Sequence, residues 1–116
     1  MVDEPELLAN AMHHLPEEIN RRYTVLLSTP YFLEFLHPDC NKGNGIAQLA
    51  GYLNIDAEAV ICVGDAGNDA HMLDYAGLGV AMGNATASLK QKADYVTFSN
   101  EEDGVAHVIE KFILQR

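Results

Sequence analysis

Residues 59–69 read Ala-Val-Ile-Cys-Val-Gly-Asp-Ala-Gly-Asn-Asp, an unbroken apolar run followed by a polar loop that contains two glycines. The run lacks the apolar–polar alternation of a strand with one exposed face. A continuous apolar run of this length is typical of a parallel strand that is buried on both faces. We therefore predict a buried parallel strand at 59–63, with a polar loop at its carboxyl end.

The chain on either side of this run predicts a regular order of helices and strands. From Gly43 onward, helical and extended segments alternate with short connections, which favours an α/β fold with a parallel sheet. Right-handed crossovers would then place helices on both faces of that sheet. We expect further strands at 78–82 and 95–98, helices at 43–53, 69–76 and 86–93, and a last helix that begins with a Ser99–Glu102 capping box.

The first third of the chain lacks this order. Apolar residues fall on one face of a short helix expected at 6–15. Two segments rich in β-branched, aromatic and apolar residues, 23–27 and 31–36, are expected to be strands. The change of pattern predicts two domains, with residues 1–38 in an α+β unit and residues 39–116 in the α/β unit.

The composition of the chain limits its partners and its setting. It has 116 residues, 48% of them hydrophobic, and a formal net charge of -10. Such a charge disfavours binding to nucleic acid and to anionic membranes, so neither is an expected partner. Two cysteines in no metal or redox spacing, and a start that is acidic where a signal peptide is basic, favour a reducing, cytoplasmic setting.

The loop after the central strand carries Asp65, Asn68 and Asp69. Ligands of open α/β sheets bind at the carboxyl ends of the strands, and carboxylate and carboxamide oxygens are the ligands that Mg²⁺ prefers. The alternative is structural: Asp65 and Asn68 would cap turns, and Asp69 would stabilise the start of the next helix. From the residue types alone, the two interpretations are evenly matched.

A second candidate is Lys42, in the segment Asn41-Lys42-Gly43-Asn44-Gly45. A lysine beside the free N–H groups at the start of a helix can bind an anion. The order of residues is wrong for a Walker loop, which needs a glycine loop before its lysine. Taken alone, a solvated lysine in a glycine-rich turn is the favoured interpretation.

Together, the two loops resemble the third and fourth motifs of the haloacid dehalogenase (HAD) superfamily. The resemblance extends along essentially the whole chain and is closest to the Cof-type subfamily of sugar-phosphate phosphatases. The six segments that carry it are Tyr31-Phe32-Leu33-Glu34, Asn41-Lys42-Gly43, Gly64-Asp65-x-x-Asn68-Asp69, Met72-Leu73-x-Tyr75-Ala76-Gly77, Val80-Ala81-Met82-Gly83-Asn84-Ala85 and Ser99-Asn100-x-x-Asp103-Gly104-Val105-Ala106.

The resemblance implies a role for each matched residue. Asp65 matches the aspartate that binds magnesium, and Asn68 and Asp69 match positions that complete the metal and water shell. Lys42 matches the lysine that neutralises the nucleophile and the transferred phosphoryl group. Asn84 is a further candidate for contact with the substrate, although capping of the next helix is the favoured role for it. The implied reaction is Mg²⁺-dependent hydrolysis of a small phosphorylated metabolite through an aspartyl-phosphate intermediate.

One departure from the family is large, because the chain contains no Asp-x-Asp nucleophile motif. The resemblance therefore implies the C-terminal part of a Rossmann-like HAD core, preceded by the end of an α+β cap, without the nucleophile. In the family the nucleophile strand lies beside the strand that ends at Asp65, so residues 60–63 would have an exposed edge and could mediate self-association. The alternative is a non-catalytic module for binding or assembly that keeps half of the fold.

Overall fold

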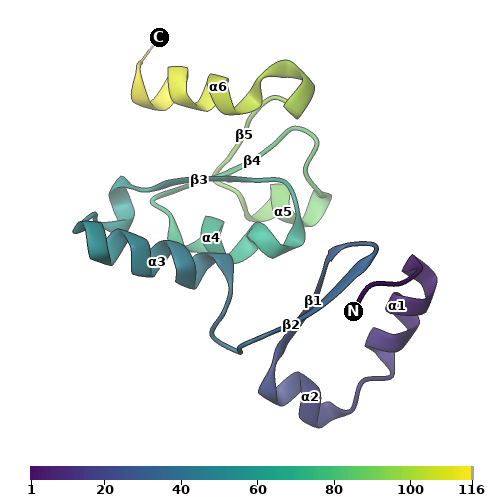
Figure 1. Ribbon diagram of the computed structural model, residues 1–116. Helices are drawn as coiled ribbons and strands as arrows, with labels where there is room; N and C mark the ends of the chain where they lie inside the picture. The colour runs from purple at the N-terminus through teal and green to yellow at the C-terminus, as the bar shows by residue number, and fades with distance from the viewer. Residues whose placement is uncertain (116) are drawn as a thin grey trace. The chain divides into compact units, whose positions relative to one another are not determined.

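The computed structural model describes residues 1–115. By internal contacts the chain divides into two compact units, Met1–Asn41 and a second unit that begins at Lys42 (Figure 1). The sequence places its boundary slightly earlier, after residue 38.

The first unit contains two helices and two strands. Helix α1 and both strands confirm the sequence prediction, whereas α2 is not predicted. Two ion pairs support α2, and each joins residues that are four apart in the sequence. They are Glu17–Arg21 at 2.6 Å and Glu18–Arg22 at 3.4 Å. The elements are α1 (Pro5–His13), α2 (Glu17–Arg22), β1 (Thr24–Thr29) and β2 (Phe32–Leu36).

Strands β1 and β2 form an antiparallel hairpin. Val25 lies opposite Phe35 and Leu27 lies opposite Leu33, so these four side chains share one face. Leu33 on this face is fully buried, as is Leu8 of α1, which contacts β2. The hairpin and α1 therefore form a small core of their own.

The second unit is the predicted α/β fold. Its parallel sheet has the order β3–β4–β5, which confirms the predicted fold class. Figure 1 shows α3, α4 and α5 on one side of the sheet and α6 on the other. The elements are α3 (Lys42–Leu53), η1 (Ala57–Ala59), β3 (Ile61–Gly64), η2 (Gly67–Asp69), α4 (Ala70–Tyr75), β4 (Leu78–Ala81), α5 (Ala87–Lys92), β5 (Tyr95–Val96), η3 (Asn100–Glu102), α6 (Gly104–Val108) and η4 (Ile109–Ile113).

The core of the second unit lies between the sheet and helices α4 and α5. Its buried residues come from β3, from α4, from β4 with the loop after it, and from α5. They are Cys62, Leu73, Ala81, Met82, Ala85 and Leu89. Residues of β3 alternate between half-buried and buried, whereas Gly79, Val80 and Ala81 of β4 are all buried. Among residues 1–115, β3 pairs with β4 alone and β4 pairs on both sides.

Helix α3 approaches α4 closely at its first turn. A Cβ atom on Gly43 would lie 2.4 Å from the carbonyl oxygen of His71, whereas a Cβ on Gly45 or Gly51 would meet nothing within 4 Å. The glycine at position 43 is therefore required for this approach, which brings the start of α3 toward the helix that follows the Asp65 loop.

The C-terminal part of the unit differs from the prediction. Strand β5 is two residues long, and the Ser99–Glu102 pair begins the short helix η3 where a long helix is predicted. Asp103 then adopts a left-handed conformation, with φ of 55°, and helix α6 starts after it. The backbone packs closely just after this break, since a Cβ atom on Gly104 would lie 2.2 Å from the carbonyl oxygen of Phe98.

The part of the chain that the structure describes contains no helix long and apolar enough to cross a membrane.

Candidate functional site

The loop that carries Asp65 is anchored to the neighbouring strand and loop. Gly64, the last residue of β3, accepts a hydrogen bond through its carbonyl oxygen from the N–H of Met82, at 2.8 Å. The carbonyl oxygen of Asp65 accepts a hydrogen bond from the N–H of Thr86, at 3.1 Å. These bonds place Asp65 at the carboxyl edge of the sheet, where the sequence predicts a site.

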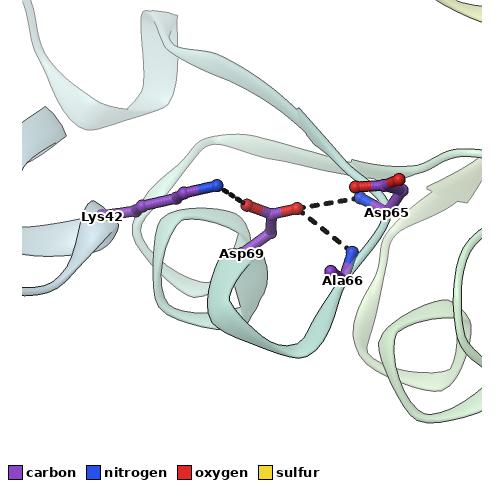
Figure 2. A network of polar contacts seen from close by, with 4 residues as sticks. All are labelled: Lys42, Asp65, Ala66 and Asp69. Atoms are coloured by element: carbon purple, nitrogen blue, oxygen red, sulfur yellow. Dashed lines mark hydrogen bonds and ion pairs between the residues drawn. The ribbon is translucent and has the colours of Figure 1, made fainter. Parts of the chain in front are cut away.

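Asp69 is the centre of the polar network at this edge. One carboxylate oxygen, Oδ2, accepts hydrogen bonds from the N–H groups of Asp65 and Ala66, at 2.9 and 3.1 Å. The other, Oδ1, accepts a hydrogen bond from the ammonium group of Lys42 (Figure 2). Both oxygens of Asp69 are thus engaged with the protein, and the contacts join α3 to the loop after β3.

Gly64 makes room for this arrangement. A Cβ atom at position 64 would lie 2.5 Å from the Cβ of Asp69 and 2.8 Å from its Oδ2. Such distances are shorter than carbon atoms tolerate without displacement, so a larger residue would push Asp69 from the loop. The sequence places Gly64 in the loop and in the family motif but does not predict this contact, although a glycine at the end of a buried strand is a general signal of close packing.

The environment of Asp69 keeps its carboxyl group ionised. Burial by itself would raise the pKa of Asp69, but the hydrogen bond from Lys42, the two backbone hydrogen bonds and the positive charge of Lys42 outweigh it and hold the pKa below its usual range. The carboxylate therefore stays charged and holds the ammonium group in place at neutral pH.

The side chain of Lys42 is half exposed, but the carboxylate that it contacts is buried. Its side chain is 51% exposed, whereas the side chain of Asp69 is 4% exposed. The ammonium group has three N–H donors, and Asp69 accepts from it on the side of the loop. The ion pair with Asp69 shows that Lys42 is not a freely solvated lysine, and its predicted contact with phosphate stays a prediction.

Asp65 and Asn68 lie on the same turn, and their residue types suit a magnesium ion. Asp65 is exposed and Asn68 is half-buried. Within residues 1–115 the carboxylate of Asp65 makes no hydrogen bond or ion pair with the protein. The same residues hold no group of three or more histidine, cysteine, aspartate or glutamate side chains that could bind a metal. One available carboxylate is enough for Mg²⁺, which keeps several waters and binds substrate oxygens.

The structure places Asn84 away from a helix cap. Thr86 is the N-cap of α5, and its hydroxyl oxygen accepts a hydrogen bond from the N–H of Leu89 at 3.4 Å. The interpretation of Asn84 as the cap of this helix is therefore wrong. Its side-chain oxygen accepts a hydrogen bond from the N–H of Asn100, at 2.9 Å, which joins the loop after β4 to the segment after β5.

Comparison with known proteins finds similarity to haloacid dehalogenase-like hydrolases over almost all of the chain. The sequence model of a family described as haloacid dehalogenase-like hydrolases matches residues 1–109. The Bacillus subtilis (strain 168) protein YxeH is 42% identical over 115 residues, which are 99% of this chain and 43% of that protein.

Solved structures share the fold as well as the sequence. A haloacid dehalogenase-like hydrolase from Bacteroides thetaiotaomicron is 38% identical with a TM-score of 0.82, covering 97% of this chain and 42% of its own. A structure described as the HAD subclass IIB sugar phosphatase BT4131 is 34% identical with a TM-score of 0.73, covering 79% and 35%. The chain thus spans less than half the length of each of these relatives.

Proposed function

Because the chain belongs to the haloacid dehalogenase-like hydrolase family, we propose that it forms part of a magnesium-dependent phosphatase that hydrolyses small phosphomonoesters. The observation that carries this proposal is the pair of Lys42 and Asp69 beside the exposed carboxylate of Asp65, at the carboxyl end of β3. Phosphoryl transfer depends mainly on positioning and on neutralisation of charge, and this arrangement supports both.

Each residue has a distinct part in the proposed reaction. Asp65 would hold the magnesium ion with help from Asn68, and the bound ion would supply positive charge to the phosphate oxygens. Lys42 would donate hydrogen bonds to the phosphoryl group and to the nucleophile. Asp69 would keep the ammonium group of Lys42 and the N–H groups of the loop in position, because both its oxygens are already bound to them.

The family supports a proposal for the substrate class and for the nucleophile. Similarity to a sugar phosphatase supports sugar phosphates among the small phosphorylated metabolites that the complete enzyme would hydrolyse. The reaction would pass through an aspartyl-phosphate, formed when an aspartate carboxylate attacks the phosphorus and the alcohol leaves. Since this chain has no Asp-x-Asp motif, we propose that the nucleophile comes from polypeptide outside it. The reaction would take place in the cytoplasm.

Binding of Mn²⁺, a paramagnetic substitute for Mg²⁺, tests the proposed metal site in the chain as it exists. We expect Mn²⁺ to broaden the nuclear magnetic resonance signals of the Asp65 loop, and Asp65→Asn to weaken its affinity by at least about tenfold, as loss of the main charged ligand predicts. Asp74→Asn is the matched control, since Asp74 lies on α4 and pairs with Lys92. Equal, small effects of both substitutions would contradict the assignment and favour the non-catalytic module.

A further inference from the structure

The loops that follow β4 and β5 are tied together beside the loop that carries Asp65. The N–H of Asn100 donates a hydrogen bond to the side-chain oxygen of Asn84, at 2.9 Å. The backbones also lie in close contact, since a Cβ atom on Gly83 would be 2.7 Å from the backbone nitrogen of Ser99. Asn84 thus supplies the side-chain part of a junction between two segments that are 16 residues apart in sequence.

The loop after β4 in turn holds the Asp65 loop. Thr86, two residues after Asn84, donates its N–H to the carbonyl oxygen of Asp65, at 3.1 Å. The same loop is held from α5, because the ammonium group of Lys90 donates a hydrogen bond to the carbonyl oxygen of Gly83 at 2.5 Å. Two hydrogen bonds, joined by the backbone of residues 84–86, therefore connect Asn100 with Asp65.

We infer that Asn84 is a positioning residue for the Asp65 loop and acts through its side-chain oxygen. This inference rests on the proposed function, since it assigns to Asn84 the fixing of the loop that would bind magnesium. A single hydrogen bond of this kind contributes a factor of about 2 to 10 to an equilibrium constant. The contribution is therefore large enough to measure and too small to decide whether the unit folds.

Three substitutions separate the side-chain oxygen of Asn84 from its amide group. Asn84→Ala removes both groups, whereas Asn84→Asp keeps an acceptor oxygen and removes the N–H donors. Asn100→Pro removes the donor from the other side. Proline is compatible there, because Asn100 is the first residue of η3 and Ser99 before it is extended, with ψ of 170°. Gln91→Ala, an exposed position on α5, is the control.

The rate of amide hydrogen exchange at Thr86 measures, without any metal, how firmly the loop after β4 is held. We expect Asn84→Ala and Asn100→Pro each to speed exchange of the Thr86 N–H by about 2- to 10-fold, with no further increase when they are combined. Asn84→Asp and Gln91→Ala are expected to leave that exchange within about twofold of the unsubstituted chain. Affinity for Mn²⁺ is expected to fall in Asn84→Ala and in Asn100→Pro, and to stay at or above the original value in Asn84→Asp.

Two results would overturn the inference. Unchanged exchange at Thr86 in Asn84→Ala would show that the hydrogen bond to Asn100 does not hold the loop. An equal loss of Mn²⁺ affinity in Asn84→Ala and Asn84→Asp would show that the amide N–H donors matter, as they would for a residue that contacts the ligand. Failure of the proposed function has a different signature, in which the unsubstituted chain binds no Mn²⁺ while exchange at Thr86 still responds to Asn84.

Discussion

At the scale of single residues, two lysines with similar exposure have different partners. The side chains of Lys42 and Lys92 are 51% and 55% exposed, but Lys42 pairs with the buried Asp69 and Lys92 with the half-exposed Asp74. An exposed ion pair adds little stability, whereas removal of the partner of a buried carboxylate leaves its charge uncompensated. The contact with Asp69 thus distinguishes Lys42 from an ordinary surface lysine.

We predict that Lys42→Met lowers the free energy of unfolding by about 1–3 kcal/mol, because Asp69 loses a hydrogen-bond donor in a buried place. Circular dichroism should stay unchanged, and in the complete enzyme turnover should fall by at least about 100-fold, as for other groups that stabilise charge in a transition state. Lys92→Met is the control and should change stability by less than about 0.5 kcal/mol. Retained turnover in Lys42→Met would contradict a role in the reaction and would leave Lys42 as a structural partner of Asp69.

The two cysteines should differ in reactivity and in their effect on stability. Burial raises the pKa of the Cys62 thiol, whereas Cys40 is exposed. Because the folded pKa of Cys62 lies above that of the unfolded chain, its contribution to stability is complete below about pH 8.5 and is lost as pH rises through the folded value. We expect native chain to label at Cys40 and unfolded chain at both positions.

The stability of Cys62→Ala gives a second measurement of the same effect. Chemical unfolding at about pH 7 should show the unsubstituted chain to be the more stable, since alanine leaves a small cavity in the core. That difference should shrink at about pH 10, above the usual range of a thiol. Rapid labelling of Cys62 in the native chain, or a constant difference across this range, would contradict the prediction.

Sequence reasoning found the residues of the site that lie next to one another in the chain. Asp65, Asn68 and Asp69 share a loop, and metal binding was one of two evenly matched interpretations of their residue types. The contacts of Asn84 could not be predicted in this way, because its partner Asn100 lies in another loop. The position of that loop depends on β5, a strand of only two residues. The hydrogen bonds to both oxygens of Asp69 could not be predicted either, because the contact with Lys42 depends on how closely α3 approaches the loop after β3.

At the scale of elements, helix α3 offers three glycines in different surroundings. Gly43→Ala is predicted to destabilise the unit by about 1–3 kcal/mol, because its Cβ would meet the backbone of His71, which cannot move as a side chain can. Gly51→Ala, in open space on the same helix, should stabilise it by about 0.5–1 kcal/mol. The measurement is chemical unfolding, and equal effects of both substitutions would show that α3 does not pack tightly on α4.

Prediction of the elements succeeded where the local pattern decides the structure and failed where it does not. The apolar run that ends in β3 predicted a parallel strand, and the structure confirms it. The pattern of the last helix was misleading, because the Ser99–Glu102 capping box is real but begins a single short turn. The break at Asp103 lies next to the close packing of Gly104 against Phe98, a contact that the local pattern does not predict.

At the scale of the whole molecule, the sheet is open along β3. Among the residues that the structure describes, β3 pairs with β4 alone, and the site at its carboxyl end contains no nucleophile motif. An unpaired strand edge can recruit another strand, although the net charge of -10 opposes contact between two copies. We therefore expect the edge to pair more readily with the part of the protein that supplies the nucleophile than with itself.

Our last prediction is that this chain alone hydrolyses no phosphomonoester. The proposed route needs a carboxylate nucleophile next to the metal, and loss of a nucleophile typically lowers the rate by about 10⁴- to 10⁶-fold. The assay is hydrolysis of an aryl phosphate with Mg²⁺, first by this chain and then after addition of a polypeptide that carries the part of a longer relative that this chain does not match. Sedimentation velocity measured alongside would show whether the 12.7 kDa chain self-associates and whether the added part forms a mixed complex. Activity that appears after mixing, and is lost in Asp65→Asn, is the expected result. Turnover by this chain alone that depends on Mg²⁺ and on Asp65 would contradict it, since a carboxylate within these 116 residues would then have to serve as the nucleophile.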